Sequence, residues 1–127
     1  MYKIIEIGGK KQKMVSNALL PRLYRAHFGR DFILDMKKLQ DACKNAIVKN
    51  SDGEDVVDFE KVNPETFDSM VFENICWIML KQGGNEVGNT VEEWLDTINF
   101  VELYKYMGVV NELLSASRKT TSRPKKK

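Results

Sequence analysis

Residues that build metal centres and disulfide frameworks are scarce in this 127-residue chain, which has one histidine and two cysteines. Cys43 and Cys76 stand alone, without a CxxC pair or a neighbouring histidine, so we predict two reduced thiols acting as small core residues. A single histidine cannot build a His-rich metal site. We therefore expect no metal and no cofactor.

Long apolar runs are also missing. No stretch approaches the roughly 18 residues that a membrane span needs. The opening MYKIIEIGGKK has neither the apolar h-region nor the cleavage site of a signal peptide. We expect a cytoplasmic protein without a membrane partner. With 43% hydrophobic and 30% charged residues, the chain can bury the core of one domain.

Catalytic signatures are absent as well: the chain contains no GxSxG, P-loop, HExxH or dinucleotide-binding motif. The glycines and lysines of residues 8–11 lie in a predicted hairpin turn, and the carboxylates of residues 52–58 lack the spacing of a calcium loop. His27 has no nucleophile near it in sequence and is interpreted as a helix C-terminal residue. We therefore expect no catalytic residues and no enzyme.

Charge is abundant but unevenly spread. Residues 1–50 carry a net charge of +7, residues 51–117 carry −11, and residues 118–127 carry +6. The acidic middle segment would repel a phosphate backbone, which argues against a nucleic-acid partner. Two consequences of this polarity stay open: copies of the chain associate head to tail, or the opposite charges pair within one fold.

Hydrophobic periodicity predicts a mainly α fold with a small N-terminal β-hairpin, an α+β class. Alternating side chains on both sides of Gly8-Gly9 predict the hairpin over residues 2–16. Residues 18–117 are predicted to form a compact bundle of about five helices around a buried central helix, completing one globular domain over residues 1–117. The basic segment 118–127 has almost no apolar residues and is expected to be disordered.

The first helix is predicted to begin at Pro21 and to end at Gly29, and Asp31 is predicted to cap the second, over residues 32–49. The inner face of that second helix is a stripe at helical spacing, made of Phe32, Met36, Leu39, Cys43 and Ile47. Residues 50–62 follow as a solvated loop. In that loop Val56, Val57 and Phe59 either form a short strand or cover the body.

Asn63-Pro64 is predicted to start the central helix, which is apolar nearly all round from Phe67 to Leu80. Thr90 and Glu93 have capping-box spacing, and a last helix is predicted over residues 100–116. Its inner side is predicted to consist of Phe100, Leu103, Tyr104, Met107, Val110, Leu113 and Leu114. Gly108 lies within that helix, which implies either close packing or a bend.

Four segments, taken in order, resemble one protein family. PRLYRAHFGRD after a hairpin, FENICWIMLKQGG, VEEWLDTINFVELYKYMGVVNELL and a Thr/Ser/Lys-rich end resemble the tail assembly chaperones of long-tailed phages and prophages of Gram-positive bacteria. The resemblance covers nearly the whole chain. Leu20 departs from it, because a Ser or Thr N-cap is expected before the proline.

The resemblance implies a non-enzymatic assembly factor in the cytoplasm of the bacterial host, absent from the mature virion. Such proteins coat the helical, apolar tape measure protein and keep it soluble until tail tube subunits assemble around it. The tape measure protein is thus the implied partner, and the major tail tube protein is a second candidate. The family often makes a longer product by ribosomal frameshifting. An A-rich slippery run and a solubilising basic tail are the two interpretations of residues 125–127 that stay open.

The partner-binding prediction joins basic and aromatic side chains and one methionine of the first and last helices: Arg22, Tyr24, Arg25, Phe28, Tyr104 and Met107. Six methionines suit adaptable contacts with apolar helices, and they suit an ordinary core equally well. The alternative function is a small nucleic-acid-binding protein that uses the basic N-terminal half and the tail. Steep weakening of binding with salt would identify that alternative.

Overall fold

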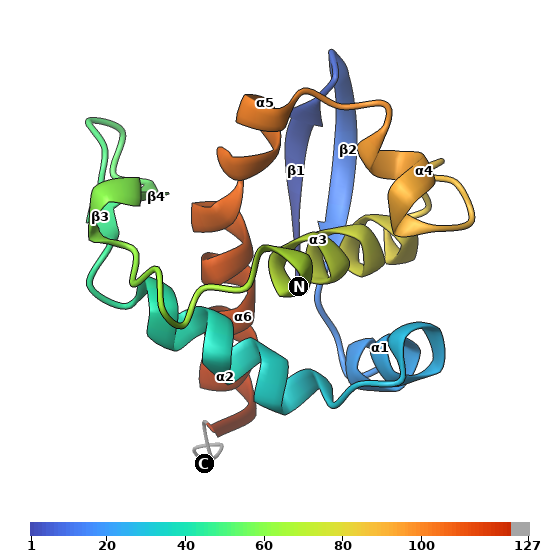
Figure 1. The fold of residues 1–127 in the computed structure, drawn as a ribbon, viewed down its shortest axis with the longest axis horizontal. Helices are drawn as coiled ribbons and strands as arrows, with labels where there is room; N and C mark the ends of the chain where they lie inside the picture. Colours follow the sequence, from blue (N-terminus) through green and yellow to red (C-terminus); the bar gives the residue numbers. More distant parts are fainter. Residues whose placement is uncertain (123–127) are drawn as a thin grey trace.

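The computed structural model of the protein describes residues 1–122, which form six α-helices and two small antiparallel ribbons. Helix α3 runs through the middle of the molecule (Figure 1) and packs against β2, α1, α2 and α4. The elements are β1 (Tyr2–Ile7), β2 (Lys10–Val15), α1 (Leu20–Phe28), α2 (Phe32–Cys43), β3 (Ile47–Lys49), β4 (Asp55–Val57), the 3₁₀ turn η1 (Phe59–Lys61), α3 (Ser69–Gln82), α4 (Val91–Leu95), α5 (Phe100–Tyr104) and α6 (Met107–Ser122). The predicted mainly α fold with an N-terminal hairpin is confirmed.

The hairpin turns at Gly8 and Gly9, whose φ angles of 62° and 78° lie where a Cβ is unfavourable. Strands β1 and β2 pair in antiparallel register from Tyr2–Val15 to Ile7–Lys10. Ile5, Ile7 and Met14 are buried and join the core that β2 shares with α3. The hairpin therefore depends on the central helix for its stability.

Helix α1 starts without a capping side chain, because Leu19 occupies its N-cap position. Asn17 Oδ1 accepts a hydrogen bond from the Leu19 backbone N–H at 3.0 Å, and this contact closes a turn just before the helix begins. Gly29 ends α1 with a φ of 67°, and the Asp31 side chain caps α2, both as predicted.

The second helix is shorter than predicted, since α2 ends at Cys43 and residues 47–49 form strand β3. Strand β3 pairs with β4 through Ile47–Val57, Val48–Val56 and Lys49–Asp55. The helical spacing between Ile47 and the buried stripe of α2 is a coincidence. Pairing between two β-branched segments overrides that spacing, because these side chains favour the extended backbone.

Asn63-Pro64 does not start the central helix. The side-chain oxygen of Asn63 accepts a hydrogen bond from the Glu65 N–H at 3.0 Å, and its backbone carbonyl accepts one from the Phe67 N–H. These two contacts close a single turn. Helix α3 instead begins at Ser69 with Asp68 as its N-cap. It is also less apolar than predicted, because the side chain of Met70 is 66% exposed.

The predicted last helix is broken into α5 and α6 at residues 105–106. The Tyr106 hydroxyl donates to the Glu6 carbonyl, which ties the break to β1. At Gly108 an added Cβ would lie 2.1 Å from the Asp55 carbonyl oxygen. Close packing of β4 on the first turn of α6 therefore explains this glycine.

The two ends of the predicted last helix differ from expectation. Phe100 is 75% exposed rather than on the inner side, because the break rotates α5 away from the α6 stripe. Helix α6 continues to Ser122, so the backbone is helical over part of the segment predicted to be disordered, and no Gly or Pro interrupts residues 109–122. The lysines of residues 125–127 lie outside the described residues.

The core is built around α3, where Val71, Phe72 and residues 75–80 are buried. Trp77 donates its indole N–H to the Val87 carbonyl at 3.1 Å. Cys43 and Cys76 are buried free thiols, as predicted, and burial raises the pKa of Cys43 to about 11. None of the helices within residues 1–122 has the length and apolar character of a membrane span.

Candidate docking surface

The predicted partner-binding residues of α1 divide between surface and core. Arg22 and Arg25 are exposed, and Arg25 lies 3.6 Å from the Asp31 carboxylate. Tyr24 is fully buried, and Phe28 is half-buried with its ring edge-on to Trp77 at 5.9 Å. Only the two arginines of this set are therefore open to a partner.

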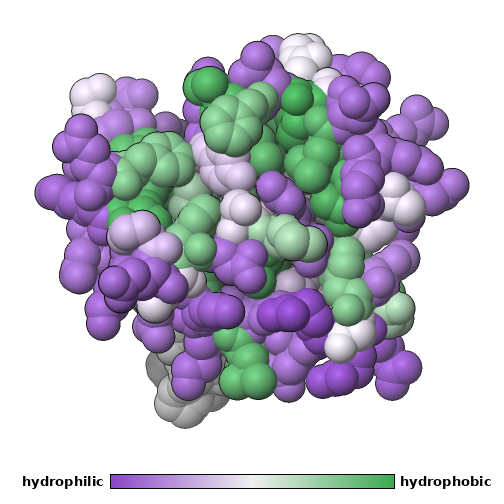
Figure 2. Space-filling model, in the orientation of Figure 1, coloured by the Kyte–Doolittle hydropathy of each residue, from purple (hydrophilic) through white to green (hydrophobic). Residues whose placement is uncertain are grey.

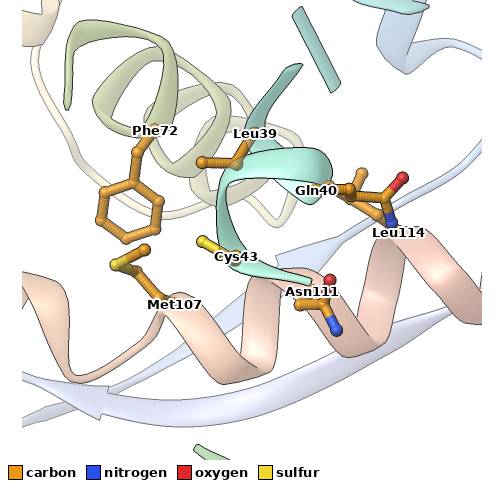
Figure 3. Close-up of a pocket in the computed structure, with 7 residues that line it drawn as sticks. All are labelled: Leu39, Gln40, Cys43, Phe72, Met107, Asn111 and Leu114. Atoms are coloured by element: carbon orange, nitrogen blue, oxygen red, sulfur yellow. The ribbon is translucent and has the colours of Figure 1, made fainter. Parts of the chain in front are cut away.

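The two predicted residues of the last helix divide in the same way. Tyr104 is the last residue of α5 and is half-buried, whereas Met107 is buried at the start of α6. Met107 points toward Phe72 and Cys43 across a gap of about 10 Å³ (Figure 3). The gap is lined by Leu39, Gln40, Cys43, Phe72, Met107, Asn111 and Leu114. A gap of this size holds one water molecule at most.

Tyr24 and Tyr104 belong to separate aromatic groups, so the structure does not bring the predicted set into one surface. The inner cluster consists of Tyr24, Phe28, Phe32 and Trp77, whose rings meet edge-on. The outer cluster consists of Phe59, Phe100 and Tyr104. Figure 1 places α1 and α5, which carry these tyrosines, on opposite sides of α3.

The inner cluster is closed by a charge network that joins α1 to α2. The Tyr24 hydroxyl donates to Asp35 Oδ2 at 2.7 Å, and Arg30 donates to both Asp35 oxygens at 2.6 and 2.8 Å. The hydrogen bond from Arg30 holds the pKa of the buried Asp35 carboxyl below its ordinary value. Within PRLYRAHFGRD, Tyr24 and Arg30 therefore stabilise the fold, a role that the spacing of the sequence did not reveal.

Two further features, a surface hollow and the exposed His27, do not indicate a particular ligand or reaction. A solvent-open hollow of about 400 Å³ lies between the hairpin tip and α4, and its lining includes Lys10, Lys11 and Glu86. These charges have both signs and favour no ligand of one charge. His27 is exposed and lies edge-on to Trp77 at 5.1 Å. In the part of the chain that the structure describes, no three His, Cys, Asp or Glu side chains are grouped to hold a metal ion.

The outer cluster is an exposed aromatic surface fixed to the core. Phe100 and Phe59 are 75% and 52% exposed, and their rings meet Tyr104 at 5.3 and 6.1 Å. Tyr104 in turn stacks on the fully buried Phe72 at 5.3 Å. Figure 2 shows hydrophobic surface where Figure 1 places α5 and η1. Large exposed apolar groups that cluster in this way mark interaction sites.

A half-buried carboxylate adjoins the outer cluster. Glu73 Oε2 accepts from the Tyr104 hydroxyl at 3.4 Å. Burial raises the pKa of Glu73, and the negative charges of Asp68 and Glu92 raise it further. None of the ion pairs among the described residues involves Glu73. The site thus combines exposed rings with a desolvated negative charge that has no cation beside it.

Sequence analysis found Tyr104 but missed the other three members of this site. Phe100 has the spacing of an inner-face residue, Phe59 lies in a loop, and Glu73 lies in a helix predicted to be buried. Phe100 lies one helical turn before Tyr104 on α5, but its exposure and the approach of Phe59 and Glu73 depend on how α5, η1 and α3 pack, which no local pattern in the sequence reports.

Protein-family models, curated proteins and solved structures were compared with the chain, and none of them matches it.

Proposed function

We propose that this protein is a phage tail assembly chaperone, which binds the tape measure protein and keeps it soluble while the tail tube assembles. The observation that carries the proposal is the outer cluster, an apolar surface displayed by a highly charged body. A chaperone of an apolar helical protein needs both properties, because the surface binds the client and the charge keeps the complex in solution. The ordered resemblance of four segments to that family supports the same proposal.

In this proposal the protein acts by binding alone, in the cytoplasm of the bacterial host, and leaves before the virion is complete. The tail tube protein is a second partner, which would replace the chaperone on the tape measure protein. A longer frameshifted product would share the described domain. The nucleotide sequence at residues 125–127 tests this last point, since a run broken by G without an open downstream frame excludes it.

Co-expression with the tape measure protein of the same phage or prophage tests the proposal. We expect the tape measure protein to move from the insoluble to the soluble fraction, and to be retained by the tagged chaperone at both low and high salt. Apolar contacts survive moderate salt, whereas contacts made by exposed charges are screened. A tape measure protein that is not retained at either salt would overturn the proposal.

Nucleic-acid binding through the basic N-terminal half is the competing function. Four basic residues of that half already lie within 4 Å of a carboxylate, in the pairs Lys3–Glu112, Arg25–Asp31, Arg30–Asp35 and Lys49–Asp55. This pairing lowers the charge available to phosphates. Tight binding of single- or double-stranded oligonucleotides, lost steeply as salt rises, would favour this function over the chaperone.

A further inference from the structure

We infer that the outer cluster and Glu73 together form a docking site for an amphipathic helix of the partner, with apolar side chains on Phe59 and Phe100 and a lysine or arginine beside Glu73. The inference rests on the proposed function in one respect only, that the partner is the tape measure protein. It adds the surface and the chemistry by which the partner is recognised.

The apolar half of the site is preorganised. Phe59 and Phe100 both contact Tyr104, whose ring is stacked on the buried Phe72. Exposed rings held in this way lose little freedom when a partner covers them, so more of the contact energy appears as affinity. Val101, next to Phe100 on α5, is also exposed, at 66%.

The charged half of the site favours a basic partner. The segments that carry the site, residues 58–61, 68–73 and 100–105, hold five carboxylates against two lysines. Glu73 lies within this acidic surface, and its neighbours include the Tyr104 hydroxyl and the carboxylates of Asp68 and Glu92. A partner's ammonium or guanidinium group would supply the missing cation, and burial of the pair would strengthen it.

The elements of the site favour a helix as the occupant. Helices α3 and α5 and the turn η1 satisfy much of their backbone hydrogen bonding internally, so contact with a partner falls mainly to side chains. An amphipathic helix offers apolar side chains at every third or fourth position with a basic residue beside them, which matches neighbouring rings flanked by one carboxylate. Nucleic acid is disfavoured by the same carboxylates.

The first experiment uses the full-length chain and a labelled synthetic peptide with leucine on one helical face and lysine on the other. We expect Phe100→Ser to weaken binding by at least about tenfold, as for loss of a central aromatic contact. The control is Ile4→Ser, which removes an exposed apolar side chain on β1, outside the site, and should leave binding within about twofold. Equal weakening by Phe100→Ser and Ile4→Ser would overturn the inference.

The second experiment tests the charge. Glu73→Gln should weaken binding of the lysine peptide severalfold and reduce its salt dependence, whereas Glu65→Gln, the same change at an exposed position, should not. A peptide with glutamate in place of lysine should bind poorly. If the glutamate peptide binds as tightly as the lysine peptide, the charged half of the inference is wrong.

The third experiment separates this inference from the proposed function. If the tape measure protein is retained equally by wild type and Phe100→Ser, the docking site is wrong and the chaperone function stands. If wild type does not retain the tape measure protein but binds the lysine peptide through Phe100 and Glu73, the site stands and the function is wrong. Oligomers of the chain that dissociate on Phe100→Ser would show a second copy in the site and overturn the inference.

Discussion

Tyr24 and Tyr104 each donate a hydrogen bond to a carboxylate, Asp35 at 2.7 Å and Glu73 at 3.4 Å. Asp35 also receives two hydrogen bonds from Arg30 and has a lowered pKa, whereas Glu73 is in none of the ion pairs among the described residues and has a raised pKa. Tyr24 is buried in the core, whereas Tyr104 contacts the exposed rings of Phe59 and Phe100.

The difference separates a structural pair from one that is open to a partner. The inner cluster satisfies its polar groups within the chain, so its contribution is to stability. The outer cluster leaves apolar surface and an uncompensated charge at one place, and natural proteins retain such local costs mainly where function needs them. Tyr24, unlike Tyr104, is enclosed and presents no surface in this structure.

The largest expected effect comes from breaking the inner pair. Asp35→Ala leaves the buried Tyr24 hydroxyl and the Arg30 guanidinium without their acceptor, and should lower the free energy of unfolding by about 3 kcal/mol. Urea denaturation followed by circular dichroism measures this change. Asp41→Ala, at an exposed position of the same helix, should stay within about 0.5 kcal/mol of wild type. Equal losses in both variants would contradict the distinction.

The pH dependence of stability should differ in sign between the two carboxylates. A lowered pKa at Asp35 means that its stabilising contribution is present above its unfolded value of 3.8 and is lost as pH falls through the folded pKa. The stability difference between wild type and Asp35→Asn should therefore be constant near neutral pH and shrink below pH 3.8. A difference unchanged down to the acid transition would contradict the assignment.

A smaller and opposite effect is expected at Glu73. Because its pKa is raised, the charged form costs stability above the folded pKa, and the cost disappears as pH falls below its unfolded value of 4.5. Because the carboxylate is only half-buried and solvent screens it, Glu73→Gln should stabilise the protein at pH 7 by no more than about 0.5 kcal/mol, measured by urea denaturation. The gain should vanish in acid. Destabilisation at pH 7 would show that the charge is needed for folding.

The smallest expected effect on stability is that of the most exposed ring. Phe100→Ser should change the free energy of unfolding by less than about 0.5 kcal/mol, because the side chain is 75% exposed and leaves no cavity. Thermal unfolding of the two proteins measures this difference. A large loss would mean that Phe100 belongs to the core and that its effect on peptide binding reports unfolding.

Local patterns in the sequence were sufficient for much of the frame. The hairpin at Gly8-Gly9, the end of α1 at Gly29 and the caps at Asp31 and Thr90 follow from the chemistry of residues close in sequence. The burial of most of α3 follows in the same way from its apolar composition, because a helix with so few polar positions has to be enclosed.

The failures share a physical cause, which is that contacts between distant segments outweighed a weak local preference. Ile47 pairs with Val57 in a ribbon instead of continuing the helical stripe of α2. The predicted last helix is interrupted where the Tyr106 side chain contacts β1. At Asn63, a side chain able to cap a helix instead closed an isolated turn, and Asp68 took the capping position.

The candidate site shows the same division. By itself, the sequence determined a mainly α chain with a charged exterior, an apolar central helix and a Tyr104 that could lie at a surface. Only the tertiary structure decided that Phe59 meets Tyr104, that Glu73 takes part in none of the ion pairs among the described residues, and that Tyr24 is enclosed with Arg30 and Asp35. Local chemistry acts over a few residues, whereas these neighbours come from segments up to 45 positions apart and are set by how α3, α5 and η1 pack.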